Sequence, residues 1–379
     1  MPDGYIKNEN AAYAYVFRWN SNDAIKALIW LLQHDYKAHV ALREFTSNGE
    51  KFERGSIIIP IGTNPKNIHE QMQRIAKQYH LTVYSAKSGY TEKGINLGSD
   101  RAVRLKKPKI IVATNTPVSS ESFGAIWSMF DNDYGVDFIP MKLDRLRSID
   151  LHDYTAMIFP DDWGNGYGYK SQLDSNAVQK IKTWIAGGGT FIGIEGGAAF
   201  ASASVGKISS VKIKEKKKAD EKKDEKKDDK KDVKKEEKLS DEELEKRMTV
   251  EERERKQRLE YIPGTMMRVK LDNSHPLGFG YDSIITVLKT TNTMFELSEK
   301  GYNVGIYTKS PRLSGYISKE NEKMLEETPF LIHERLGSGN IVLFTDDPNF
   351  RLFWENLNKV FFNSVLLMPS IRDVTMTAE

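Results

Sequence analysis

The sequence contains no cysteine among its 379 residues. Disulfide bonds, thiolate metal sites and cysteine nucleophiles are therefore excluded, although this absence leaves the cellular compartment open. There is also no run of eighteen apolar residues, so we expect no membrane-spanning helix. The polar amino terminus, Met1 to Tyr5, has none of the features of a signal peptide.

Outside one lysine-rich segment, the sequence also has no large excess of positive or negative charge. Residues 212–238 contain fourteen Lys and ten Asp or Glu, a net charge of +4, whereas the whole chain has +3. The remainder is therefore close to neutral. Nucleic-acid-binding domains concentrate positive charge on one face, so we expect no nucleic-acid partner. The segment itself has only three apolar residues and is interpreted as a solvated spacer.

Strand-like and helix-like patterns alternate through residues 1–105 and predict a small α/β domain. The apolar runs predict strands at residues 13–18, 38–42, 56–61 and 81–85, and helices at residues 23–33 and 65–79. Residues 87–107 show no periodicity and are interpreted as a connector.

A second α/β pattern begins at residue 106. We expect strands at residues 109–114, 136–140, 156–160 and 190–194, and helices from Ser119 or Ser120 and over residues 173–186. Their order is typical of an open, doubly wound, mostly parallel sheet of the flavodoxin-like kind.

This second domain is expected in two parts, residues 106–206 and 263–379. The charged insertion between them, residues 207–262, is predicted to be disordered to helical, with an exposed helix up to about Glu260. The second part is predicted to contain strands at 266–271, 284–288, 304–308, 330–334 and 341–344, and an apolar helix at 351–367.

A nucleophile elbow is predicted at Gly193-Ile194-Glu195-Gly196-Gly197. The spacing is that of a G-x-nucleophile-x-G turn between a strand and a helix. The outer glycines suit a turn in which the two backbones pass too close for a Cβ atom. The residue at the apex, however, is Glu195, a carboxylate where such sites carry Ser or Cys.

Four segments resemble one protein family. They are Ala12–Phe17, Gly187–Phe200, Lys270–Tyr281 and Leu343–Arg351. Together they are similar to the C-terminal region of large bacterial M14-type zinc carboxypeptidase-like proteins, where a class I glutamine amidotransferase-like domain follows the peptidase domain. The resemblance covers nearly the whole chain, including a Lys/Glu-rich insertion at this place.

The resemblance implies a fold and a secreted or periplasmic parent, but neither known activity. An M14 zinc site needs a His-x-x-Glu pair, and none of the seven histidines is followed by Glu three positions later. An amidotransferase needs an elbow Cys and a His-x-Glu segment, where this chain has Asp346-Asp347-Pro348. We therefore expect no metal, no cofactor and no enzymatic activity in this chain.

Glu195 is the first candidate for a binding site. It is expected at the carboxyl edge of the sheet, where α/β folds bind ligands. A helix begins there, and its dipole favours a negative charge, so we expect a low pKa that suits a ligand-holding carboxylate. In the alternative interpretation, Glu195 only caps backbone N–H groups of a relic elbow.

Two acidic pairs are expected at the same edge. Asp161 and Asp162, followed by Trp163, end one strand, and Asp346 and Asp347 end another. With Glu195 they would suit a divalent cation or an acid/base pair. The alternative is turn chemistry, for which Asp is well suited.

The remaining candidates are weaker. His275 and His333 could each act as a base, but the chain offers them no nucleophile to serve. Arg18 and Trp19 could contact a ligand, although anchoring the end of a strand is the simpler role.

The leading hypothesis is a non-catalytic, amidotransferase-like region that binds an unknown small ligand and accompanies a peptidase domain or peptidase-like protein. One alternative is a hydrolase that uses Glu195 with Asp162 or Asp347. Another is a carbohydrate- or peptide-binding module that uses Trp163 and the loop at residues 164–169.

Overall fold

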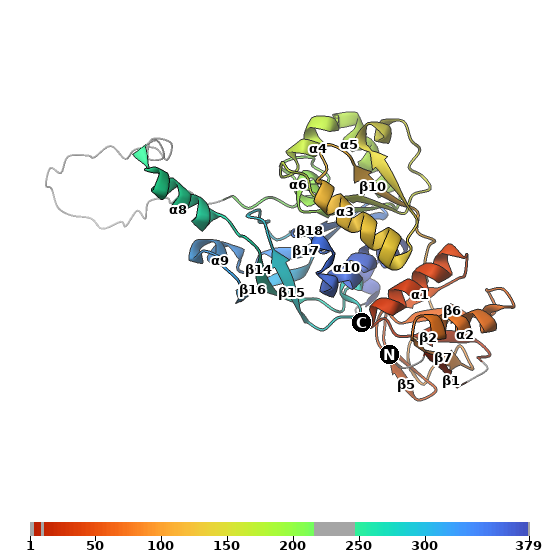
Figure 1. Cartoon of the computed structure of the whole chain (residues 1–379). Coiled ribbons are helices and arrows are strands. Elements are labelled where there is room, and N and C mark those ends of the chain that lie inside the picture. The colour runs from red at the N-terminus through yellow and green to blue at the C-terminus, as the bar shows by residue number, and fades with distance from the viewer. Residues whose placement is uncertain (1–3, 9–10, 216–246, 378–379) are drawn as a thin grey trace, which may run out of the picture.

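The computed structural model describes residues 4–8, 11–215 and 247–377. Most of the predicted charged insertion lies outside the described residues. Its last part contains α8 (Val250–Glu260), the exposed helix expected there, which extends away from the rest of the protein (Figure 1).

Residues up to Arg104 form a six-stranded sheet with two helices, as predicted for a smaller α/β unit. The strand order is β1 (Tyr5–Lys7), β7 (Thr82–Ala86), β2 (Ala14–Phe17), β6 (Ile57–Pro60), β3 (His39–Ala41) and β9 (Ala102–Arg104). The pair β1–β7 is parallel, and the other pairs are antiparallel. The helices are α1 (Asn22–Gln33), capped by Ser21, and α2 (Ile68–Gln78).

The interpretation of residues 87–107 as a connector without regular structure is wrong, because this segment contains two strands. One is β9, and the other is β8 (Lys93–Gly94), which joins β4 (Phe45–Ser47) and β5 (Glu50–Phe52) in a small separate sheet. Strands of two or three residues are too short to establish a period of two in the sequence, so periodicity does not reveal them.

The second sheet has nine strands and is mixed. Its order is β11 (Phe138–Lys142), β10 (Ile110–Thr114), β12 (Ala156–Phe159), β13 (Thr190–Ile194), β18 (Gly339–Phe344), β17 (Pro329–Leu336), β16 (Tyr302–Ser314), β14 (Thr265–Leu271) and β15 (Ile284–Lys289). The first five strands are parallel and the rest are joined antiparallel. In chain order the parallel part reads 2-1-3-4-5, the flavodoxin-like order. The predicted doubly wound arrangement therefore holds for about half of the sheet.

Helices cover both faces of the parallel part (Figure 1). Alternate residues of β10 point to opposite cores. Ile110 and Val112 pack in one core with α3 (Ser120–Ser128) and α10 (Asn358–Phe362). Ile111 and Ala113 pack in the other core with α4 (Tyr167–Gln172), α5 (Ser175–Ala186) and α6 (Gly196–Ala201). The sheet is thus sandwiched, which leaves the ends of its strands as the place for a site.

The predicted continuous helix at 351–367 is wrong in its first half. Only Asn358–Phe362 is α-helical; a π turn follows it, and two 3₁₀ turns precede it. Arg351 and Leu352 have φ values of +48° and +65°, so a right-handed helix does not pass through them. The apolar pattern after residue 357 is nevertheless buried as expected.

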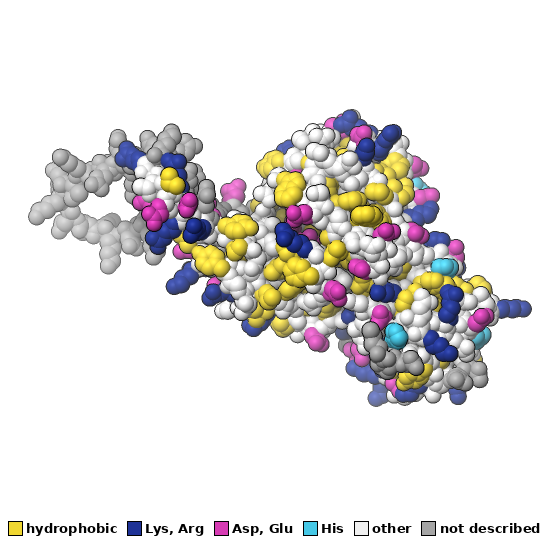
Figure 2. Space-filling model, in the orientation of Figure 1, with side chains coloured by type: hydrophobic (Ala, Val, Ile, Leu, Met, Phe, Trp, Pro, Cys, Tyr) yellow, Lys and Arg dark blue, Asp and Glu magenta, His cyan; other side chains and the backbone are white. Residues whose placement is uncertain are grey.

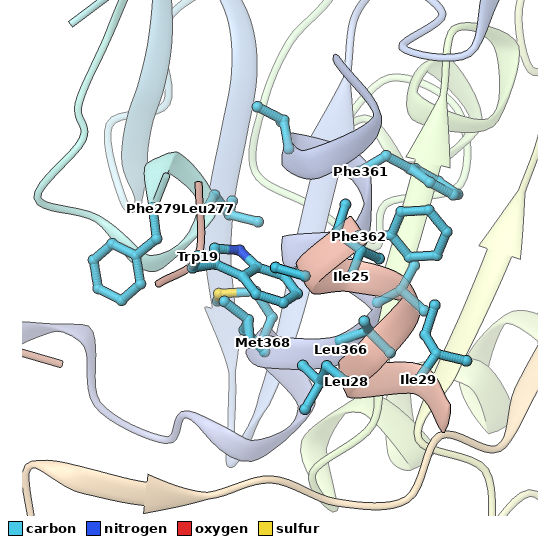
Figure 3. Packing of buried hydrophobic residues seen from close by; sticks show 14 of the residues in the cluster. Trp19, Ile25, Leu28, Ile29, Leu277, Phe279, Phe361, Phe362, Leu366 and Met368 are labelled. Carbon is cyan, nitrogen blue, oxygen red and sulfur yellow. The ribbon is translucent and has the colours of Figure 1, made fainter. Parts of the chain in front are cut away.

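The helix α1 joins the two sheets through the carboxyl-terminal segment. Figure 3 shows Ile25, Leu28 and Ile29 of α1 packed beside Phe362 and Leu366 in one apolar cluster.

A buried amide crosses the same interface. Trp19 Nε1 donates to Asn363 Oδ1 at 2.7 Å, and Asn363 Nδ2 donates to the carbonyl oxygens of Leu277 and Phe279 at 2.9 and 3.0 Å. All three hydrogen bonds of Asn363 are shielded from water, so their loss would leave buried polar groups unpaired.

The exposed surface combines charges of both signs. In Figure 2 Lys and Arg alternate with Asp and Glu, and hydrophobic side chains gather over the end of the sheet formed by β14, β15 and β16. In the described residues no helix has the length and apolar character needed to cross a bilayer.

We expect Asn363→Ala to lower the free energy of unfolding by about 3 kcal/mol, because three buried groups lose their partner. Asn358→Ala is the matched control on the same segment, since Asn358 makes one side-chain bond, to Tyr134, and should cost about 1 kcal/mol. Urea unfolding monitored by Trp fluorescence measures both. If the two variants lower the free energy of unfolding by the same amount, the role assigned to Asn363 is refuted.

Candidate functional site

The elbow predicted from the glycine spacing is present. Glu195 follows β13 with φ +47° and ψ −106°, and α6 begins at the next residue. A Cβ on Gly193 would lie 2.7 Å from the carbonyl oxygen of Gly197, and one on Gly197 would lie 2.0 Å from that of Phe159. Both distances are too short for any side chain, so glycine is required at the two outer positions.

Glu195 does not cap the helix, contrary to the alternative interpretation. Its side chain makes no hydrogen bond to the first turn of α6. Asp161 takes that role, because its Oδ1 accepts from Gly196 N at 2.8 Å. The Glu195 carboxyl instead faces the turn after β15, where Oε1 accepts from Thr290 Oγ1 at 3.1 Å.

The expected low pKa of Glu195 is also wrong. Burial raises the pKa of Glu195 well above its ordinary value, and the neighbouring carboxylates of Asp347, Asp161 and Asp346 raise it further. Desolvation disfavours the charged form, and like charges add to that effect. A helix of six residues contributes too small a dipole to compensate.

Asp347 lies in the same cluster and is 7% exposed. Its Oδ1 accepts from Asn349 N at 2.7 Å. Burial, with smaller contributions from Asp161 and Asp346, raises the pKa of Asp347 to about 7 against that hydrogen bond. Burial likewise raises the pKa of Asp161 to about 6, with a smaller contribution from Asp162.

Asp346 differs from its neighbours because it has a cationic partner. Its Oδ1 accepts from Lys289 Nζ at 2.8 Å, and its Oδ2 accepts from Tyr307 OH at 2.6 Å. All three side chains are buried. Lys289 also donates to the carbonyl oxygen of Thr293 at 3.0 Å. This ion pair is therefore internally satisfied, as a buried pair must be to persist.

The structure thus brings Glu195, Asp161, Asp346 and Asp347 together and adds Lys289, Tyr307 and Thr290, which sequence reasoning missed. Lys289 is the last residue of β15, and a lysine at the end of an apolar run is the signal that could have indicated it. The missed residues lie in β15, β16 and the turn after β15, whose pairing was not predicted.

Asp162 and Trp163 point to other roles. Asp162 Oδ1 accepts from Gly166 N at 2.6 Å and its Oδ2 from Tyr169 N at 3.3 Å, so both oxygens fix the loop before α4. This is the turn chemistry considered as the alternative. The Trp163 side chain is 74% exposed and therefore belongs to the surface of that loop.

The two histidines form part of a buried chain of hydrogen bonds away from the elbow. His275 Nδ1 accepts from Leu277 N, so its Nε2 donates to His333 Nδ1 at 3.1 Å, and His333 Nε2 then donates to Asn340 Oδ1 at 3.0 Å. Burial lowers the pKa of both rings, that of His333 to about 4. Neutral rings with both nitrogens engaged serve the structure rather than proton transfer.

The strand-end residue Arg18 is an anchor. It donates to Tyr84 OH and to the carbonyl oxygen of Lys51, at 2.5 and 2.7 Å. Trp19 is an anchor too, through its hydrogen bond to Asn363.

A divalent cation is not supported at the elbow. No group of three or more His, Asp or Glu side chains in the described residues is arranged to hold a metal ion. What the arrangement offers is a set of carboxyl groups with raised pKa values, next to one satisfied ion pair.

No family model matches the sequence, and no curated protein matches it. Solved structures with some likeness include a GMP synthase-like protein from Thermoplasma acidophilum, at 12% identity and TM-score 0.39, with 72% of this chain and 94% of that chain covered. A ThuA-like protein from Bacteroides uniformis has 8% identity and TM-score 0.38, with 68% and 89% covered. A glutamine amidotransferase from Thermotoga maritima has 9% identity and TM-score 0.37, with 72% and 99% covered.

Similarities with such low sequence identities and TM-scores do not indicate the function of this chain. What the structure itself shows is a flavodoxin-like strand order in the parallel part and an elbow after β13.

We expect Asp347→Asn to stabilise the protein at pH 8 and to leave it unchanged near pH 4. The raised pKa of Asp347 means that the folded state disfavours its charge, so wild-type stability falls as pH rises from about 4 to about 7. Asparagine keeps the acceptor for Asn349 N and removes that penalty, which is on the order of 4 kcal/mol because each pKa unit corresponds to about 1.4 kcal/mol. Thermal unfolding of wild type and Asp347→Asn between about pH 4 and about pH 8 tests this prediction. A difference in melting temperature that does not change with pH would contradict it.

Asp162→Ala should destabilise the protein by about 2 kcal/mol, because two buried backbone N–H groups lose their acceptor. Asp153→Ala, at an exposed aspartate, should have no measurable effect. Chemical unfolding of both variants distinguishes this structural role from a catalytic one, which predicts an unchanged stability.

Proposed function

We propose that this chain is a non-catalytic, amidotransferase-like region whose elbow binds a small cation, such as a protonated amine. One observation carries the proposal. Within the described residues, Asp346 has Lys289 as its ion-pair partner, whereas Glu195, Asp161 and Asp347 have none.

A cation at the elbow would replace the protons that these carboxyl groups retain. Unpaired, buried carboxyl groups lower the stability of the folded state when they ionise. Groups with pKa values perturbed in this way are found most often at functional sites. An incoming ammonium group would favour the charged forms, so binding should release protons. Glu195 also has a positive φ value of 47°, and strained backbone conformations of this kind cluster at functional sites.

We further propose an M14-type zinc carboxypeptidase-like protein as the partner, either as a separate chain or as a preceding domain. The support is the resemblance of four sequence segments to that family. An amine-binding elbow is compatible with such a partner, because the amino terminus of a peptide is itself an ammonium group. The division into domains at residues 1–105, 106–206, 207–262 and 263–379 belongs to the same proposal.

A hydrolase is the second candidate. The pKa of Asp347, raised to about 7, suits proton transfer near neutral pH, and the raised pKa of Glu195 suits a general acid. Asp162 is less suited, because backbone N–H groups occupy both its oxygens. A hydrolytic screen in which Glu195→Gln abolishes turnover of any substrate would replace the non-catalytic proposal.

A carbohydrate-binding module is favoured by the exposed aromatic side chains of Trp163 and Tyr167, at 74% and 59% exposed. Aromatic rings of this kind present large, rigid contact area. Trp163→Ala should then weaken sugar binding without affecting amine binding.

We expect putrescine to bind at pH 7.5 with proton release, measured by isothermal titration calorimetry in two buffers of different ionisation enthalpy. Glu195→Gln and Asp347→Asn should each weaken binding by roughly tenfold, because each removes one charge-assisted contact. Trp163→Ala is the control and should leave the affinity unchanged. Unaltered binding in Glu195→Gln, or binding of neutral sugars alone, would contradict the proposal.

A further inference from the structure

The strand β15 forms one edge of the nine-stranded sheet, and no strand in the part of the chain that the structure describes pairs with its outer side. Leu271 N donates to Ser283 O, so the backbone groups of every second residue from Ser283 onward face β14. Those of Ile284, Thr286 and Leu288 therefore point away from the sheet. A row of unpaired backbone N–H and C=O groups is a ready template for another strand.

The other edges of the two large sheets are protected against such pairing. At the opposite edge of the same sheet, β11 contains Pro140, which has no backbone N–H. The edges of the six-stranded sheet, β1 and β9, are three residues long and end with Lys7 and Arg104. Short strands, proline and charged side chains all prevent pairing between edges. By contrast, β15 has six residues and no proline, and its one charged side chain, Lys289, is buried.

There is space for a strand beside this edge. An open groove of about 530 Å³ lies there, and its lining includes Tyr281, Ile284, Thr286 and Asn356. The Asn356 side-chain amide Nδ2 donates to the outward carbonyl oxygen of Thr286 at 2.9 Å, the bond that the N–H of an added strand would make. Asn356 is itself exposed, so an incoming strand can displace its side chain.

The sequence of β15 is suited to pair with a second copy of itself. In an antiparallel pair with a two-fold axis at Thr286, the two Thr286 residues lie opposite each other. Ile284 then lies opposite Leu288, and Ile285 lies opposite Val287. Each pair joins two apolar side chains or two threonines, which are combinations that stabilise neighbouring strands. Residues 284–288 contain no charged side chain, so no like charges meet in this pairing.

The two faces of β15 also continue across such an axis. Ile285 and Val287 belong to the buried core, so the paired strands would extend one apolar layer from copy to copy. On the other face Ile284 is 49% exposed, and the Leu288 of a second copy would cover it. Burial of apolar surface adds to the hydrogen bonds that the edges exchange.

We propose that this chain forms a two-fold symmetric dimer in which the β15 strands of two copies pair antiparallel, with Thr286 on the axis. The two Thr286 residues exchange their backbone N–H and C=O hydrogen bonds, and the two nine-stranded sheets become one continuous sheet. This proposal does not depend on a ligand at the elbow.

Sedimentation velocity of the full chain over a range of concentrations measures the association. We expect wild type to reach twice the mass of one chain. Ile284→Lys places a charge on the edge, and Thr286→Pro removes an outward N–H without removing a bond to β14, so each should weaken dimerisation by roughly tenfold or more. Ile139→Lys is the matched control, because Ile139 is 44% exposed on the opposite edge strand, β11. It should leave the dimer unchanged.

Introduced cysteines test the register, because the chain has none of its own. Thr286→Cys should form a disulfide between two copies on oxidation, since residues opposite each other in an antiparallel pair are close enough for one. Ile284→Cys should not, because the two copies of residue 284 would lie about 13 Å apart along the strands. Non-reducing electrophoresis distinguishes the two variants.

Thermal unfolding followed by circular dichroism checks that each variant is folded. The proposal is overturned if wild type is a monomer at every concentration, or if Ile284→Lys and Thr286→Pro both dimerise like wild type. It is also overturned if Ile139→Lys abolishes the dimer, or if Ile284→Cys cross-links and Thr286→Cys does not.

Discussion

The close approach of two backbones at the elbow is the constraint on which the site depends. Gly193 and Gly197 have no room for a Cβ atom, so β13 and α6 meet in one sharp turn. That turn holds Glu195 at φ +47°, a conformation that a non-glycine residue adopts only when its surroundings fix it. The carboxyl group is thereby held beside Asp161 and Asp347, where burial and like charge raise its pKa.

The sequence predicts the elements that depend on local patterns. The glycine spacing predicts the elbow, and the apolar runs predict the parallel strands, whose carboxyl ends bring Asp161, Glu195 and Asp347 to one edge. The pKa direction of Glu195 could not be predicted in this way, because burial is a property of the packed fold. Lys289 and Tyr307 were missed for the same reason, since they reach Asp346 from an antiparallel extension whose register no local pattern specifies.

The turn at the end of β18 links the elbow to the carboxyl-terminal segment. Asp347 belongs to the elbow, and its Oδ1 accepts a hydrogen bond from the backbone N–H of Asn349. The carboxyl-terminal segment that follows packs on α1, and Trp19 is hydrogen-bonded to Asn363. The segment that follows one carboxyl group of the elbow is therefore also the segment that joins the two sheets.

The central claim is that Glu195 and Asp347 have raised pKa values in the free protein and release protons to solvent when a cation binds beside them. Titration of their side-chain carboxyl ¹³C chemical shifts by NMR, with and without putrescine, measures this directly. The account predicts that Glu195 in the free protein titrates above the ordinary range for a glutamate and that its midpoint moves to lower pH when putrescine saturates the site. Ionised carboxyls at pH 7 without ligand, with midpoints at the ordinary values for Glu and Asp, would contradict it.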